Sequence, residues 1–261
     1  MPSESTPSRV FVITGGGSGI GAAVAEALAP ENTVVICGRR LAPLERVAAR
    51  CGAIPVATDL TDPSAIESLV KDTVETHGKI DGLVLNAGIV LASPIRSMSD
   101  ADWNAQLATN LTAPFLMIRA ALPSLLATHG SVVAISSVAG ATTGMGMAGY
   151  AASKAGLNLL IQTLAFEHAR HGLRANVVAP GWTRTEMADS EMDLKEGETL
   201  EGAYRRVSAL IPARRAASSC EIAAAVTFLL SPAASFVNGA VLNVDGGGSV
   251  VNAGLAGFDV P

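Results

Sequence analysis

Short apolar runs that alternate with longer amphipathic stretches are the feature that most constrains this fold. The runs with the length of strands are Val10–Thr14, Thr33–Cys37, Ala53–Ala57, Gly82–Leu85, Ser131–Ser136, Arg174–Val178 and Ala240–Val244. The stretches with helical spacing of apolar residues are Ile20–Ala29, Leu41–Arg50, Ala65–His77, Ala101–Ala127, Gly149–Arg170 and Glu221–Leu230. This alternation indicates βαβ units and a parallel sheet. The strands are nearly continuous in apolar character, which indicates helices on both faces. We therefore predict an α/β fold with one doubly wound parallel sheet of about seven strands.

No linker divides the chain, so we expect a single domain. The 261 residues contain no Pro/Ser-rich tract, charge block or internal repeat that interrupts the alternation. We expect a disordered polar tail over residues 1–9 and one domain over residues 10–261, long enough to bury a substantial core. Ser218 and Glu221 have the spacing of a capping box at the start of the last helix.

Composition argues against several classes of protein. Hydrophobic residues make up 49% of the chain, but uninterrupted apolar runs such as Val10–Ile13 are far too short to span a bilayer. The polar stretch Met1–Ser8 has no apolar core, so we expect no secretory signal. A net charge of −5 without a basic, aromatic-rich patch argues against nucleic acid. Cys37, Cys51 and Cys220 lack metal-ligand spacing, so we expect buried free thiols, no metal site and a cytoplasmic location.

A glycine-rich turn, Thr14-Gly15-Gly16-Gly17-Ser18-Gly19-Ile20-Gly21, joins the first expected strand to the first expected helix. Glycines permit close approach of the backbone to a phosphate, and the helix N-terminus supplies free N–H groups and a positive dipole end. Such a turn by itself can be a flexible connector, but its place between strand and helix favours a dinucleotide pyrophosphate. The expected contacts are Gly15, Gly17, Ser18, Gly19, Ile20 and Gly21.

The spacing of Gly15, Gly19 and Gly21 after a threonine resembles that of the short-chain dehydrogenase/reductase family, and the resemblance covers essentially the whole chain. The resemblance implies a Rossmann-type sheet and an NAD(P)-dependent oxidoreductase. Such an enzyme transfers a hydride between nicotinamide and a ketone or secondary alcohol.

Tyr150 and Lys154 are four residues apart in an expected helix, so they lie on one face. A free tyrosine has a pKa of about 10, and lowering it to about 7 requires roughly 4 kcal/mol in favour of the phenolate. A nearby lysine ammonium is a plausible source of much of that shift. By itself this pairing is common by chance, but the resemblance assigns Tyr150 as the catalytic acid/base. It also assigns Lys154 to biasing Tyr150 and holding the nicotinamide ribose.

Two further residues complete the expected catalytic set. Ser137 follows a strand and precedes Tyr150 by the family's spacing, although Ser136 is a rival from the sequence alone. The resemblance implies that Ser137 hydrogen-bonds the reacting oxygen. Asn110 lies inside a helical pattern, where asparagine is a poor helix former. The resemblance places it at a helix kink that holds a water in a proton relay.

The remaining cofactor contacts follow from the resemblance. Asp59 and Leu60 come after the third strand, beside the adenine. Asn86-Ala87-Gly88 matches a signature that borders the adenine ribose. Pro180-Gly181 matches the segment that faces the nicotinamide, with Thr183 and Thr185 near its carboxamide. Each can also be an ordinary turn or cap residue. The full set of expected cofactor contacts beyond the first turn is Arg39, Asp59, Leu60, Asn86, Ala87, Gly88, Tyr150, Lys154, Pro180, Gly181, Thr183 and Thr185.

The end of the second strand bears on cofactor choice. An acid there binds the 2′-hydroxyl of NAD, whereas an arginine accommodates the 2′-phosphate of NADP. The segment Ile36–Arg40 has no acid, so Arg39 is the expected phosphate clamp and Arg40 an ordinary surface arginine. Ser18 occupies the place where many NADP-dependent relatives carry a second basic residue. We favour NADP(H) and keep NAD(H) as the alternative.

Substrate specificity in the family is set by the loop 182–209 and by residues just before the catalytic tyrosine. Met145, Met147, Trp182 and Met187 are the expected pocket residues, although each can instead cover the core. We hypothesise a moderately hydrophobic ketone or secondary alcohol.

Two alternatives stay open. The chain also resembles 3-oxoacyl-carrier-protein reductases, which meet an acidic carrier with basic residues near the ends of two long helices. Here Thr128, His129 and His171 occupy those places, and Ile211–Ala217 lacks the usual glycines. A cofactor-binding regulator without catalysis is the alternative from another class. The presence of Ser137, Tyr150 and Lys154 argues against it.

The family resemblance also implies a homo-oligomer, commonly a tetramer. Leu107–Leu126 and Leu157–Phe166 carry more apolar positions than a solvated helix needs, and the corresponding helices pack across subunits in the family. Leu242–Gly247 resembles the family's last strand and turn, and Ala253–Pro261 is expected to reach a neighbouring subunit.

Overall fold

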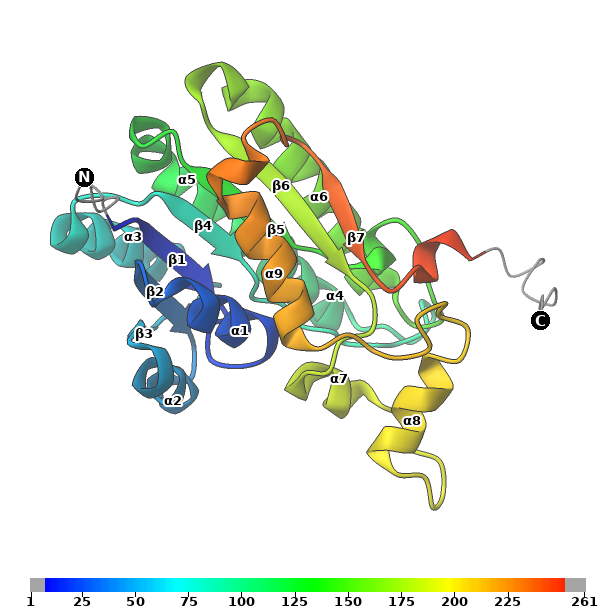
Figure 1. The fold of residues 1–261 in the computed structure, drawn as a ribbon. Coiled ribbons are helices and arrows are strands. Elements are labelled where there is room, and N and C mark those ends of the chain that lie inside the picture. Colours follow the sequence, from blue (N-terminus) through cyan, green and yellow to red (C-terminus); the bar gives the residue numbers. More distant parts are fainter. Residues whose placement is uncertain (1–7, 252–261) are drawn as a thin grey trace.

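The computed structural model describes residues 8–251, so most of the expected 1–9 tail and all of Ala253–Pro261 lie outside the described residues. Its centre is a seven-stranded sheet in the order β3-β2-β1-β4-β5-β6-β7 with every neighbouring pair parallel (Figure 1). The strands are β1 (Val10–Thr14), β2 (Thr33–Gly38), β3 (Ile54–Ala57), β4 (Gly82–Leu85), β5 (Ser131–Ile135), β6 (Arg174–Pro180) and β7 (Val241–Val244). The predicted doubly wound α/β sheet is confirmed.

Helices cover both faces of this sheet because successive strand side chains point to opposite sides. On one face Phe11 and Ile13 pack with residues of α1 (Gly19–Leu28), α2 (Leu41–Cys51) and α9 (Ser219–Leu230). On the other, Val12 and its neighbours pack with α3 (Pro63–His77), α5 (Ala113–Ala127) and α6 (Ala148–His168). Elements present in both sequence and structure agree at their ends within two residues.

The largest departure from the expected elements lies in the segment 182–209, which the sequence predicts as a loop. It contains two short helices, α7 (Glu186–Glu191) and α8 (Leu200–Val207). Thr185 and Thr199 cap them through hydrogen bonds to backbone N–H groups. Because the sequences of α7 and α8 are polar, apolar periodicity does not predict these helices. Threonine at each N-cap is nonetheless a preferred residue there. We call residues 182–209 the α7–α8 lobe.

The expected helix Ala101–Ala127 is a continuous run built from α4 (Asp100–Leu107), a π-helical turn (Ala108–Thr112) and α5. By length and composition, the run Asp100–Ala127 is apolar enough to cross a membrane. In the fold, however, α5 packs along the sheet and α3, and Met117 and Leu125 are fully buried in the core. A core-covering helix of a globular domain passes the same test.

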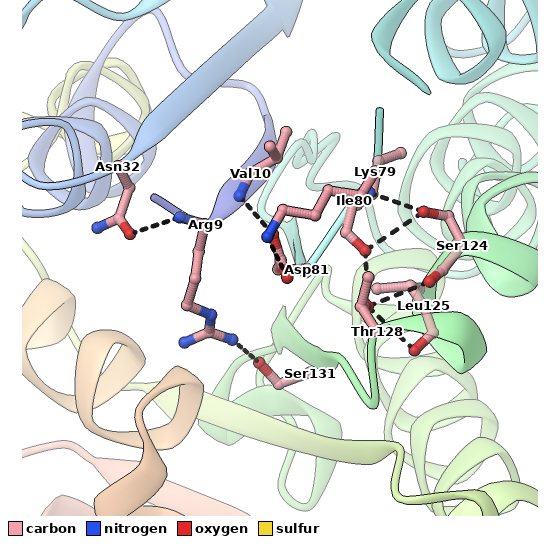
Figure 2. A network of polar contacts seen from close by, with 10 residues as sticks. All are labelled: Arg9, Val10, Asn32, Lys79, Ile80, Asp81, Ser124, Leu125, Thr128 and Ser131. Carbon is pink, nitrogen blue, oxygen red and sulfur yellow. Dashed lines mark hydrogen bonds and ion pairs between the residues drawn. The ribbon is translucent and has the colours of Figure 1, made fainter. Parts of the chain in front are cut away.

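The amino edge of the sheet is fastened by polar contacts (Figure 2). Asp81 accepts a hydrogen bond from the N–H of Val10 at 2.7 Å and forms an ion pair with Lys79 at 3.1 Å. Ser124 and Thr128 of the α5 end hydrogen-bond the backbone of Ile80. These contacts tie the starts of β1 and β4 to α5, on the edge opposite the glycine-rich turn.

Ser218 and Glu221 form the predicted capping box at the start of α9. The cysteines are unpaired, but only Cys37 is buried; Cys51 is half-buried and Cys220 is exposed. The expectation of three buried thiols was wrong for Cys51, the last residue of α2, and for Cys220, which lies in the first turn of a helix whose buried face starts at Ile222.

Candidate active site

The glycine-rich turn leaves the sheet at the carboxyl end of β1, next to the point where the chain order reverses between β1 and β4. Gly15 and Gly19 adopt positive φ angles of 66° and 53°, which favour glycine. Ser18 precedes α1 without a side-chain cap, and no acid lies in the first turn. The first N–H groups of α1 therefore remain available to an anion. This turn fits the pyrophosphate of a dinucleotide.

Asn86, the residue after β4, connects the glycine-rich turn to that strand through its side chain. Its Nδ2 donates to the carbonyls of Thr14 and Gly15 at 3.0 and 3.1 Å. Thr14 Oγ1 in turn accepts the backbone N–H groups of Asn86 and Ala87. A Cβ at Gly21 would lie 2.5 Å from Asn86 Nδ2. The sequence predicts that Asn86-Ala87-Gly88 borders the adenine ribose, and the side chain of Asn86 also holds the glycine-rich turn. Thr14 was not among the expected contacts.

Tyr150 and Lys154 lie in the first two turns of α6, as predicted. Lys154 Nζ donates to the carbonyl of Ile135 at the end of β5 at 2.8 Å, and it lies 5.6 Å from the centroid of the Tyr150 ring. Lys154 is buried, and burial lowers its pKa to about 8 because the ammonium loses solvation. The two side chains therefore stand together beside the carboxyl edge of the sheet.

Ser137 and Ser136 have separate surroundings, which the sequence left open. Ser137 Oγ accepts the N–H of Ala139 at 3.1 Å. A hydrogen bond with Ser137 also acts on the Tyr150 phenol, lowering its pKa. Ser136 is buried and donates to the carbonyl of Lys154 at 3.3 Å. Ser137 is thus the serine next to the phenol, and Ser136 is a helix-packing contact.

The pKa of Tyr150 moves against the expectation from the sequence. Burial raises it, the hydrogen bond with Ser137 lowers it, and the negative charge of Glu191 raises it. Lys154 directs its ammonium to the backbone carbonyl of Ile135, and burial is the largest cause of the raised pKa of the phenol. The phenol is therefore held in its protonated form, which is the form that donates a proton.

Asn110 sits in the π-helical turn, at the predicted kink. It is fully buried, and its side chain exchanges two hydrogen bonds with the backbone of Ile89, at 2.8 and 2.9 Å. Its Nδ2 also donates to Ser153 Oγ, which donates to the carbonyl of Tyr150. A Cβ at Gly88 would lie 3.3 Å from Asn110 Oδ1 and 3.4 Å from Lys154 Nζ. Gly88, Asn110 and Lys154 therefore meet, and Ser153, which the sequence did not single out, connects Asn110 to Tyr150.

The other expected cofactor residues lie along the same edge. Arg39, after β2, is close enough to Asp59 for its charge to lower the pKa of that carboxyl, although hydrogen bonds from Thr61 contribute more. Leu60 is buried. Pro180 ends β6, and Thr183 Oγ1 donates to the carbonyl of Gly181 at 3.1 Å.

Thr185 joins the turn after β6 to the glycine-rich turn. Its side chain caps α7, and its methyl carbon would lie 3.0 Å from a Cβ at Gly19. The first turn and the start of the α7–α8 lobe therefore touch.

The expected pocket residues are all on the surface or half-buried. Met145 is 95% exposed, and Trp182 and Met187 are 39% and 41% exposed. Met147 precedes α6 and is half-buried. Met145 and Met147 lie in the turn before α6, which carries Tyr150, and Trp182 and Met187 lie in the α7–α8 lobe.

The α7–α8 lobe has a small core and polar ties of its own. Tyr204 is 2% exposed and packs with Met192, and its hydroxyl donates to Asp189 at 2.7 Å. Arg184 lies over the Tyr204 ring, 4.5 Å from its centroid, and pairs with Glu201 at 2.8 Å. These contacts hold α7 and α8 together at the carboxyl edge of the sheet (Figure 1).

A cavity of about 500 Å³ lies elsewhere, between α3 and α5. Val70, Val74, Ala120 and Ala127 line it, and it contains none of the expected site residues. Both helices cover a face of the sheet, whereas the residues described above gather at its carboxyl edge. We therefore place the site at that edge.

Comparison with known proteins identifies the family of the chain. The family model described as enoyl-(acyl carrier protein) reductase matches residues 15–249. Protein MoaE of Klebsiella aerogenes is 39% identical over 96% of this chain and 99% of its own. The 3-oxoacyl-[acyl-carrier-protein] reductase FabG of Escherichia coli K12 is 35% identical over 92% of this chain and 96% of its own. The structure of a single-residue variant of actinorhodin polyketide ketoreductase with NADPH superposes with a TM-score of 0.88 at 32% identity, covering 94% of this chain and 98% of that one.

Proposed function

The chain belongs to the short-chain dehydrogenase/reductase family, and from that premise we propose which residues carry out its reaction. It is an NAD(P)-dependent oxidoreductase that acts on C=O or CH–OH groups. The observation that carries the assignment of residues is the meeting of Ser137, Tyr150, Lys154 and Asn110 beside the glycine-rich turn. A cofactor-binding regulator without catalytic activity would not require these four side chains to lie together.

The residues along the carboxyl edge fit a nicotinamide dinucleotide. The N–H groups at the start of α1 hold its pyrophosphate, and Gly15 and Gly19 keep side chains away from it. Gly88 leaves room in front of Lys154, where any larger residue would crowd the ammonium. When bound, the nicotinamide supplies or accepts the hydride.

In the reducing direction, Tyr150 donates its phenolic proton to the carbonyl oxygen of the substrate. Ser137 donates a hydrogen bond to the same oxygen as negative charge develops on it. The ammonium of Lys154 stabilises the phenolate that Tyr150 becomes. Asn110, held by Ile89, positions the water through which Lys154 exchanges protons with solvent. A general acid of this kind contributes about 10² to 10⁴ in rate.

The pKa of Lys154 predicts how the reaction depends on pH. As the pH rises through about 8 this ammonium loses its proton, whereas Tyr150, with a raised pKa, keeps its own. We expect kcat/KM for reduction to fall about tenfold for each pH unit above about 8. A pH profile between about 6 and about 10 measures this, and a flat profile would contradict the role of Lys154.

We favour NADP(H) as the cofactor. Arg39 lies on the adenosine side of the site, no acid stands at the end of β2, and the ketoreductase that superposes was solved with NADPH. The guanidinium of Arg39 offers the planar donors that suit a 2′-phosphate. NAD(H) is the alternative.

For the substrate we propose a ketone or secondary alcohol with an apolar body. Trp182 and Met187 of the α7–α8 lobe, with Met145 and Met147 before α6, supply adaptable apolar contacts. The second candidate is a 3-oxoacyl group on a carrier protein, favoured by the identity with FabG. His129 Nδ1 lies 2.8 Å from the carbonyl of His171, so the two histidines at the helix ends are neighbours. They offer an acidic carrier less positive charge than arginines would.

The experiment that tests this function is a titration with NADPH and NADH, followed by turnover against a panel of ketones. The panel includes apolar ketones, a 3-oxoacyl thioester and the same acyl group on a carrier protein. Tight NADPH binding with turnover of the free ketones supports the proposal. A strong preference for the carrier-bound substrate would select the second candidate, and binding without any turnover would contradict the enzyme assignment.

We also propose that the enzyme works as a homo-oligomer, probed by its mass in solution. Phe115, Leu159 and Phe166 on α5 and α6 are 44%, 66% and 90% exposed. Apolar faces of this kind suit contact with a second copy, and a tetramer is the family's common arrangement. The free cysteines suit a reducing compartment, so we place the enzyme in the cytoplasm.

A further inference from the structure

A second buried amide lies one helical turn before Asn110. Gln106 of α4 is fully buried, and its Oε1 accepts the N–H of Leu91 at 3.1 Å. Its Nε2 donates to the carbonyls of Leu91 and Asp102, each at 3.3 Å. Asn110 exchanges two hydrogen bonds with Ile89 in the same way. The two amides therefore fix the backbone that follows β4 at two points.

The amide of Gln106 also meets the start of α6. A Cβ at Gly149 would lie 2.5 Å from Gln106 Nε2 and 3.3 Å from its Cδ, so the amide packs directly on the backbone there. One turn further along α6, Asn110 Nδ2 donates to Ser153 Oγ at 3.1 Å. Gly149 and Ser153 are four residues apart, as the two amides are, so each pair lies on one helix face. Tyr150 lies between these two contacts in α6, and its carbonyl accepts the hydrogen bond of Ser153 at 2.7 Å.

The turn before α6 is joined to the same backbone segment. The N–H of Ser93 donates to the carbonyl of Gly146 at 2.9 Å. Ser93 follows Leu91 by two residues, so the segment that the buried amide holds also holds this turn. Met145 and Met147, two of the proposed substrate contacts, flank Gly146. A displacement of the segment would therefore move the start of α6 and these two side chains together.

We propose that Gln106 is a positioning residue for Tyr150. Its amide holds Leu91 on one side and packs on Gly149 on the other, which fixes the first turn of α6. This rests on the proposed function, in which the phenol of Tyr150 donates a proton to the substrate carbonyl. A proton donor must lie within hydrogen-bond reach of that oxygen, and a misplacement of about 1 Å can lower the rate about 10²-fold.

The experiment compares two variants that each remove a buried amide. Gln106→Met keeps the volume of the side chain and leaves the N–H of Leu91 without its partner. Asn176→Leu is the matched control, because Asn176 is equally buried and exchanges two hydrogen bonds with the backbone of Val237 and Ala240, at 2.8 and 3.0 Å. It lies in the amino half of β6, whereas the proposed site lies at the carboxyl edge.

Both variants should melt at a lower temperature than the wild type, because each leaves buried backbone groups unpaired. In Gln106→Met we expect kcat to fall about 10- to 100-fold, while the dissociation constant of the preferred cofactor changes less than about threefold. In Asn176→Leu we expect kcat to stay within about twofold of the wild type. A kcat in Gln106→Met that matches the control would overturn the proposal.

A second variant approaches the same contact from α6. Gly149→Ala places a methyl group where the amide of Gln106 lies, so it should displace the amide from Leu91 and lower kcat. In the background of Gln106→Ala the methyl group has room, and Gly149→Ala should then cost less in kcat than it does in the wild type. Equal costs in the two backgrounds would mean that the residues act independently, which overturns the proposal.

A spectroscopic measurement separates this proposal from the proposed function. The chain contains two tyrosines, Tyr150 and Tyr204, so tyrosine labelled with 13C at Cζ gives two resonances, which Tyr150→Phe assigns. In Gln106→Met the resonance of Tyr150 should move while that of Tyr204 stays, and in Asn176→Leu both should stay. An unmoved Tyr150 resonance in Gln106→Met overturns the proposal. Failure of the wild type to turn over any ketone counts against the proposed function instead, and the resonance of Tyr150 still decides the role of Gln106.

Discussion

The proposed catalytic cluster (Asn110, Ser137, Tyr150 and Lys154) and the α7–α8 lobe lie at the same edge of the sheet, but they are held in place differently. Asn110 and Lys154 are buried, and backbone groups of Ile89 and Ile135 fix their side chains. The lobe is held by contacts between side chains, such as Arg184 with Glu201, which are 45% and 55% exposed. Exposed ion pairs contribute little to stability, so the lobe is the part of the site that changes most easily.

On the function that we propose, this difference separates the chemical step from substrate selection. The groups to which we assign proton transfer are fixed to the strands and to the long helix α6, where a displacement would expose buried hydrogen-bonding groups. Of the residues that we propose to meet the substrate, Trp182 and Met187 lie in the lobe, which a few side-chain contacts hold together. Elements of low local stability are the ones that open and close around ligands. Changes to the cluster should therefore act on kcat, and changes to the lobe on KM.

The largest effect is expected from Tyr150→Phe, which removes the proton donor from the rigid region. Turnover should fall about 10² to 10⁴-fold. The melting temperature and the NADPH dissociation constant should stay close to those of the wild type. Steady-state kinetics, thermal melts and NADPH fluorescence measure the three quantities. A variant that keeps wild-type turnover would refute the role of Tyr150.

The next effect distinguishes Ser137 of the cluster from its neighbour Ser136. Ser137→Ala removes the hydrogen bond to the reacting oxygen and should lower kcat about 10² to 10³-fold. Ser136→Ala is its matched control, because the side chain of Ser136 contacts the backbone of Lys154 rather than the phenol. That variant should lose stability rather than chemistry, which a melt combined with kcat will separate. Equal losses of kcat in both would mean that the serines act through the fold.

The sequence predicted the rigid region better than the lobe, for a physical reason. Strands β1 and β4 were placed at their observed ends because their apolar runs are buried on both faces. Tyr150 and Lys154 were paired through helical spacing. The helices α7 and α8 were not predicted because they bury few residues and depend on tertiary contacts, such as the hydrogen bond between Tyr204 and Asp189.

Directions of side chains were the harder part even in the rigid region. The segment Asn86-Ala87-Gly88 was expected to border the adenine ribose, and the sequence did not predict that the amide of Asn86 holds the carbonyls of Thr14 and Gly15. The pKa of Tyr150 was expected to fall and instead rises, because burial of the phenol outweighs its neighbours. Sequence spacing predicts which residues lie close together. The hydrogen-bond partners that other elements supply determine the direction of each side chain.

A smaller effect is expected where the α7–α8 lobe lies beside the proposed site of the cofactor phosphate. Arg39→Ala should weaken NADPH binding about 10- to 100-fold and leave NADH unchanged, because a charged hydrogen bond to the 2′-phosphate is lost. Arg40→Ala breaks the exposed contact with Glu186 of the lobe and should change either affinity less than about threefold. Fluorescence titrations measure both. An unchanged ratio in Arg39→Ala would favour NAD(H).

The smallest effect is expected inside the lobe itself. Tyr204→Phe keeps the buried ring but removes the hydrogen bond to Asp189. The carboxylate of Asp189 is exposed, so water can donate a hydrogen bond to it instead. We expect a loss of about 1 kcal/mol in stability. Because α7 loses one of its ties, KM for the ketone should rise about two- to fivefold while kcat stays within about twofold. Asp189→Asn, which can still accept the hydrogen bond, is the matched control and should keep most of the wild-type KM. A fall in kcat without a change in KM would show that the lobe and the catalytic cluster move as one unit, and the contrast between the two regions would not hold.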